Sequence, residues 1–78
     1  MTKLEFMKCE KLLNEAIINA ENANEEFTKA DSYKDIIEKS VLLAQAHNHR
    51  GYAEGINQAL AVIGFKHKRM AELGKMIS

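Results

Sequence analysis

The chain has no proline and no tryptophan, a single cysteine, and only two tyrosines and three phenylalanines among its 78 residues. Without proline, nothing forces a helix to stop, so glycines and polar capping residues must set the helix ends. Because aromatic side chains are few, the core must be aliphatic. Cys9 cannot form an internal disulfide, which favours a reducing compartment such as the cytoplasm.

The sequence also has no long hydrophobic run and no net charge. The first residues, MTKLEFMKCEK, are polar at every turn, so they do not resemble a signal peptide, and no apolar run approaches the ~20 residues of a membrane span. We therefore expect a soluble cytoplasmic protein. Residues 1–49 carry six lysines against nine acids, a net charge of −3, whereas residues 50–78 carry five cations against two acids, a net charge of +3. This asymmetry suits head-to-tail docking, or a partner that contacts only the basic end.

Apolar residues recur at helical intervals throughout, which predicts an all-α fold in one small domain, residues 1–78. The expected helices are 2–28, 32–47 and 50–77, arranged as a three-helix antiparallel bundle or as a hairpin plus a helix. The last helix carries a stripe of residues seven apart, Ile56, Ile63, Met70 and Ile77. A chain of this length buries a modest core, so we expect it to be completed by oligomerisation.

The first predicted helix begins with Thr2 as its cap and Glu5 three residues later, a capping box. Leu12, Ile17 and Ile18 widen its apolar face, and small residues at its middle allow another backbone to approach closely. An ordinary intramolecular core face is the first interpretation, and packing of a second chain here is the alternative. Because the apolar arc is wide for two small neighbouring helices to cover, we predict a homo-oligomer, most simply a two-fold dimer. The predicted interaction seam consists of Phe6, Leu13, Ala16, Ala20, Ala23 and Phe27.

Two breaks separate the three predicted helices, and a third position is a candidate break within the last one. Asp31 or Ser32 is expected to cap the second helix. The segment 48–51, Asn-His-Arg-Gly, predicts a turn, although a continuous helix from Ser32 onwards is the alternative. A turn at Gly64 and Phe65, which would split the last helix, is the alternative to a continuous helix over 50–77.

The phrase ADSYKDIIEKSVLLAQAHNHRGYAEGINQALAVIG resembles the hairpins of tetratricopeptide-type solenoids. In that family a helix ends in a short polar turn, and the next helix carries small residues and a leucine-glycine-like pair, here Ile63-Gly64. The resemblance covers Phe27 to Gly64, about half the chain; the family's proline is absent, and a solenoid needs at least three repeats. It implies a helical architecture that binds proteins.

A second pattern, residues 59–77, matches the hydrophobic positions and turn glycine of a helix-turn-helix, with Leu60 where that motif prefers a small residue. Its second helix would present cations to nucleic acid. Arg50 and Tyr52 suggest a further anion site, at the N-terminus of the third predicted helix, where an oligomer could sequester a nucleotide or another small anion. The candidate nucleic-acid or anion contacts are Arg50, Tyr52, Lys66, Lys68 and Arg69.

Neither metal binding nor catalysis has support in the sequence. His47 and His49 stand two apart and do not share a helix face, and Glu25 and Glu26 are adjacent, so they cannot act as a paired acid and base. Cys9 lies on the apolar seam. We therefore predict no cofactor and a non-enzymatic adaptor or inhibitor that binds a protein through helix contacts, with nucleic-acid binding as the alternative. The size and the Lys/Asn/Ile-rich composition are similar to those of phage or mobile-element accessory proteins.

Overall fold

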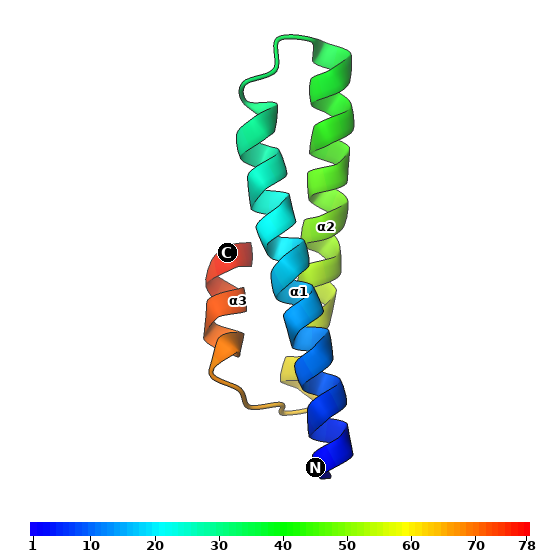
Figure 1. Ribbon diagram of the computed structural model, residues 1–78, viewed down its shortest axis with the longest axis vertical. Helices are drawn as coiled ribbons and strands as arrows, with labels where there is room; N and C mark the ends of the chain where they lie inside the picture. The colour runs from blue at the N-terminus through cyan, green and yellow to red at the C-terminus, as the bar shows by residue number, and fades with distance from the viewer.

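The computed structural model describes residues 1–78 and contains three helices and no strand: α1 (Lys3–Ala30), α2 (Ile36–Val62) and α3 (Arg69–Ile77). Helices α1 and α2 form a long antiparallel hairpin, and α3 lies beside the half of it that holds the N-terminus (Figure 1). The molecule extends 50 × 16 × 16 Å. The predicted all-α fold is confirmed in its hairpin-plus-helix form.

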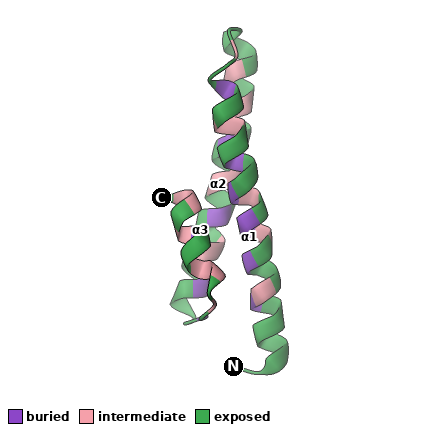
Figure 2. Cartoon of the chain, turned by 60° about the vertical axis from the view of Figure 1, so that its left-hand side comes forward, coloured by how far each residue is buried: buried purple, intermediate pink, exposed green.

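The core is concentrated where three helices meet. Leu13 and Ile17 of α1, Leu60 of α2 and Leu73 of α3 are each at most 2 % exposed. In the half of the hairpin near the α1–α2 turn, the buried residues are the alanines Ala23, Ala30 and Ala46. Figure 2 shows these buried positions along the sides on which the helices meet. Burying a leucine or isoleucine stabilises a fold by about 1.5–3 kcal/mol, so the three-helix half supplies most of the stability.

Helix α1 begins as its sequence predicts. Thr2 Oγ1 accepts a hydrogen bond from the Glu5 backbone N–H at 3.1 Å, and Glu5 Oε1 accepts one from the Thr2 N–H at 3.2 Å. The predicted interaction seam lies largely inside the folded chain, against α2 and α3. Its members Leu13, Ala16, Ala20 and Ala23 are at most 1 % exposed, whereas Phe6 is 39 % exposed and Phe27 half-buried. The surface that remains open to a partner therefore lies elsewhere.

The prediction that Asp31 or Ser32 caps the second helix is wrong. Their backbone N–H groups donate to carbonyls of the last turn of α1, at 3.3 Å and 3.1 Å, so these residues close α1. Asp35 caps α2 instead, because its Oδ1 accepts hydrogen bonds from the N–H groups of Ile37 at 2.8 Å and Glu38 at 3.2 Å.

The predicted turn at 48–51 is also wrong, since α2 continues through this segment to Val62. A glycine inside a helix costs about 1 kcal/mol relative to alanine, and packing on both sides of Gly51 outweighs that cost. Ala46 and Ala53 are fully buried. His49 Nδ1 lies 2.6 Å from Glu26 Oε1 of α1, which ties the same segment to its neighbour.

The continuous helix expected over 50–77 is wrong, and the alternative of a turn at Gly64 is the one that the structure shows. Gly64 has a φ of +75°, the left-handed conformation that ends many helices. The Phe65 N–H donates to the Leu60 carbonyl at 2.9 Å, and the Gly64 N–H donates to the Ala61 carbonyl at 3.1 Å. Phe65 then enters the core at 5 % exposure. The stripe predicted for one helix is therefore divided, with Ile56 on α2, Ile63 exposed at its end, and Met70 and Ile77 on α3.

Candidate partner-binding face

Helix α2 has a solvent-facing strip of uncharged residues, bordered by the exposed Glu38 and Glu54. We call this strip the outward face. The residues on it are all exposed, and its large apolar side chains are exposed by 85 % at Val62, 73 % at Ile37, 55 % at Val41 and 50 % at Tyr52. The outward face consists of Ile37, Ser40, Val41, Ala44, Gln45, Asn48, Gly51, Tyr52, Gly55, Gln58, Ala59 and Val62.

The centre line of the outward face follows a strict heptad spacing. One row, with members seven apart, is Ile37, Ala44, Gly51 and Gln58; the other, displaced by four, is Val41, Asn48, Gly55 and Val62. Apolar residues alternating four and three apart form the contact line of paired helices, and six of these eight positions are apolar or glycine, the exceptions being Asn48 and Gln58. This face was not predicted from the sequence, because the turn expected at 48–51 divides each row into two short pieces.

Gly51 and Gly55 have no role in packing within the chain. A Cβ atom built at either position meets no atom within 4 Å, so no neighbouring backbone requires glycine there. Each nevertheless costs about 1 kcal/mol of helix stability relative to alanine. Two glycines one turn apart at the middle of an exposed helix face leave a shallow notch into which another helix can pack closely.

The outward side of α1 shows what an ordinary solvent-facing surface looks like in the same molecule. Lys8, Lys11, Glu25 and Lys29 are all exposed there, interspersed with the exposed Leu4, Met7 and Ile18. Charged residues are typical of the solvent side of a helix, and their absence is typical of a face that another element covers. The contrast between α1 and α2 singles out the outward face of α2.

Two of the predicted anion contacts are occupied within the chain. Arg50 Nε donates to Glu54 at 2.8 Å, and Arg50 Nη2 donates to the Ile77 carbonyl at 2.8 Å, which caps the end of α3. The predicted anion site at a helix N-terminus is wrong, because Arg50 and Tyr52 lie in the middle of α2. Tyr52 Oη is 3.5 Å from a Glu15 carboxylate oxygen.

Arg69 is likewise engaged. It donates to Glu72 at 3.0 Å and to Asn14 Oδ1 at 2.9 Å. The hydrogen bond between Arg69 and Glu72 raises the pKa of the guanidinium and lowers the pKa of the Glu72 carboxyl. Lys66 and Lys68 are exposed and form no ion pair. Between α2 and α3 stand residues 63–68, a connection longer than the three to four residues of a helix-turn-helix.

The histidines point to different parts of the fold. His49 pairs with Glu26, His47 packs edge-on against the Phe27 ring at 5.0 Å between centroids, and His67 Nε2 lies 2.9 Å from Glu10 Oε2. These contacts connect α1 with α2 and with the 63–68 connection. No group of three or more His, Cys, Asp or Glu side chains is placed to hold a metal ion.

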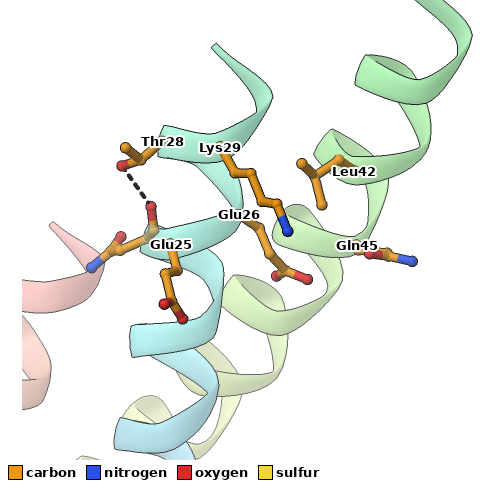
Figure 3. A pocket seen from close by; sticks show the side chains of 7 residues that line it. Glu25, Glu26, Thr28, Lys29, Leu42 and Gln45 are labelled. Carbon is orange, nitrogen blue, oxygen red and sulfur yellow. Dashed lines mark hydrogen bonds between the residues drawn. The ribbon is translucent and has the colours of Figure 1, made fainter. Parts of the chain in front are cut away.

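An open depression lies beside the α1–α2 contact. Its lining comes from both helices and includes one apolar residue, Leu42 (Figure 3). Figure 3 also shows Glu25 and Glu26 directed apart, as their adjacency in a helix predicts. Thr28 Oγ1 donates to the Asn24 carbonyl at 3.0 Å, and Glu26 is held by His49, so these groups serve the helices themselves.

No protein-family model matches the chain, and no curated protein or solved structure matches it significantly. None of its helices combines the length and the apolar character needed to cross a membrane.

Proposed function

We propose that this chain is a small non-enzymatic adaptor or inhibitor that binds a helix of a partner protein along the outward face of α2. The observation that carries the proposal is the outward face of the 27-residue helix α2, which keeps heptad spacing and has exposed charged residues, Glu38 and Glu54, only at its edges. The buried centres of protein interfaces are depleted in charge in the same way.

Two further features support this function. The notch at Gly51 and Gly55 admits a partner backbone, and the exposed Ile37, Val41 and Val62 flank it with apolar side chains. The polar groups from which catalytic sites are usually built are instead used to hold helices together, as in the His49–Glu26 and His67–Glu10 pairs. The resemblance to tetratricopeptide-type hairpins implies the same protein-binding habit.

The test is affinity capture from the native host with three forms of the tagged chain: the natural sequence, Gly55→Glu on the outward face, and Asn22→Glu on the exposed side of α1. We expect a stoichiometric protein with the natural chain and with Asn22→Glu, and its loss with Gly55→Glu, because a carboxylate at a helix contact line loses its hydration when the partner docks. Capture that is equal for all three forms would contradict the proposal.

Nucleic-acid binding is a second candidate, favoured by one observation: Lys66 and Lys68 are exposed and free of carboxylates between α2 and α3. Phosphate contacts are strongest at low ionic strength. If this function is correct, the chain binds duplex DNA in low salt and the double variant Lys66→Glu/Lys68→Glu does not. Absence of binding in low salt removes this candidate.

A further inference from the structure

The two heptad rows of the outward face are related by an exchange of their ends. The ends of the rows are large and apolar, with Ile37 and Val41 near the α1–α2 turn and Val62 at the other end, while Ala44, Gly51 and Gly55 in the middle of the rows are small and Tyr52 lies beside them. If two copies of α2 cross antiparallel about a point between residues 49 and 50, every member of one row meets a member of the other. The pairs are Ile37 with Val62, Val41 with Gln58, Ala44 with Gly55, and Asn48 with Gly51.

We infer that the helix bound by the outward face is α2 of a second copy of this chain, in an antiparallel, two-fold symmetric dimer. This inference rests on the proposed function, since it concerns the same face: a second copy covers the face in the free chain, and a partner helix displaces it on binding. Antiparallel helix pairs place the two heptad rows opposite each other, and a two-fold axis requires a self-complementary surface. The two rows satisfy both requirements.

Charge at the two ends of the molecule favours the antiparallel direction. The segment Asp31–Glu38 carries three acids and one lysine, a net charge of −2, and the segment Ile63–Lys68 carries two lysines and no acid. In the antiparallel dimer each acidic turn lies beside the basic connection of the other copy. In a parallel dimer each end would meet an end of its own sign, which is unfavourable.

The contact area suits a dimer that forms at high protein concentration. At about 1.5 Å per residue, α2 is about 40 Å long. A contact of this length across a helix diameter of about 10–12 Å covers about 800–1,000 Å², counting both copies. This lies below the range of about 1,200–2,000 Å² typical of stable interfaces, as in weaker, transient complexes. The two α2 helices would then form the centre of the dimer, with the α1 helices outside.

The first experiment is sedimentation equilibrium of the purified chain at about 100 micromolar, with circular dichroism to confirm that each variant is folded. The single chain has a mass of 8.8 kDa. We expect twice this mass for the natural chain and for the control Asn22→Glu, and 8.8 kDa for helical Gly55→Glu. A natural chain that sediments as a monomer overturns the inference, and so does a dimer that survives Gly55→Glu.

The second experiment fixes the direction. In a Cys9→Ala background, single cysteines are placed at the two ends of the outward face, Ile37→Cys and Val62→Cys, and treated with a short thiol–thiol cross-linker. In the antiparallel dimer the two Val62 positions are about 37 Å apart, so Val62→Cys alone gives no cross-linked dimer, whereas a mixture of the two variants does. Cross-linking of Val62→Cys with itself indicates a parallel dimer and overturns the inference.

These results are separate from the test of the proposed function. A monomeric chain that captures a different host protein in a Gly55-dependent way overturns the dimer and leaves the proposed function standing. A monomeric chain whose capture does not depend on Gly55 contradicts both.

Discussion

Helix α2 has two opposite faces with similar residues, and the chain covers one of them. On the inner face Ala46, Ala53 and Leu60 recur every seven residues and are at most 2 % exposed. On the outward face Val41, Asn48, Gly55 and Val62 recur at the same interval and are exposed. A heptad pattern indicates that a face is made for contact, and it does not say whether the contact lies within the chain or with a partner.

The largest expected difference between the two faces comes from placing a carboxylate on each. Ala53→Glu buries an unpaired charge at a position that is fully buried against α1, so we expect a loss of about 3–5 kcal/mol in the free energy of unfolding, enough to unfold the chain. Gly55→Glu, two residues away, is exposed and replaces glycine with a better helix former, so the single chain should stay folded. Thermal unfolding followed by circular dichroism measures both. Similar destabilisation by the two variants would contradict the assignment of the faces.

Replacing Gly51 or Gly55 by alanine should have a smaller effect, and it should raise the free energy of unfolding where Ala53→Glu lowers it. Because nothing lies within 4 Å of a Cβ at Gly51 or Gly55, alanine at each position should stabilise the single chain by about 0.5–1 kcal/mol. In a chain of this size that corresponds to a rise in melting temperature of roughly 4–8 °C per kcal/mol. The measurement is made in dilute solution, where the chain is a monomer. At high concentration the same substitutions should weaken association, because they fill the notch that admits the second helix.

Gly64 provides the control for this series. Its φ of +75° is unfavourable for alanine, which costs about 1–2 kcal/mol in the left-handed conformation. Gly64→Ala should therefore destabilise the chain while Gly51→Ala and Gly55→Ala stabilise it. If all three substitutions destabilise, the two helical glycines have a role inside the chain that the fold does not show.

Local signals in the sequence predicted some helix ends, and competing signals hid others. The Thr2–Glu5 capping box and the turn at Gly64 each depend on residues within one helical turn, so they could be predicted directly. At the hairpin turn Asp31 and Asp35 are both good caps, and only the length of α1 decides between them. The segment around Gly51 stays helical because packing against α1 outweighs its weak helix propensity, and propensity alone does not include that packing.

The turn wrongly expected at 48–51 also affected the prediction of the candidate site. The seam of α1 was correctly identified as a close-packed face, with Ala16 and Ala20 at its middle. Whether this chain or a second one covers it depends on where α2 and α3 fold back, which heptad spacing does not specify. Because α2 is one continuous helix, the two heptad rows of the outward face run along it without a break. They stay exposed after α1 and α3 have packed against α2.

The smallest expected effect comes from residues outside both faces of α2. It tests whether the stability of the fold and the association with a partner depend on different residues. The hydrogen bonds from Thr2 hold the pKa of Glu5 below its ordinary value of 4.5, and the hydrogen bond from Arg69 lowers the pKa of Glu72 in the same way. A carboxyl with a lowered pKa in the folded state stabilises the fold above its ordinary pKa, and this contribution is lost as the pH falls through the lowered value. The melting temperature should therefore decrease below about pH 4.5, and less steeply in the double variant Thr2→Ala/Arg69→Gln.

Because Thr2, Glu5, Arg69 and Glu72 all lie off the outward face, the same double variant should associate at neutral pH as the natural chain does. Sedimentation equilibrium compares the two proteins under conditions in which both are fully folded. Weaker association of the double variant would mean that docking depends on the ends of α1 and α3 as well as on α2. Unchanged association, together with a changed acid response of the melting temperature, would assign folding stability and partner binding to different parts of the chain.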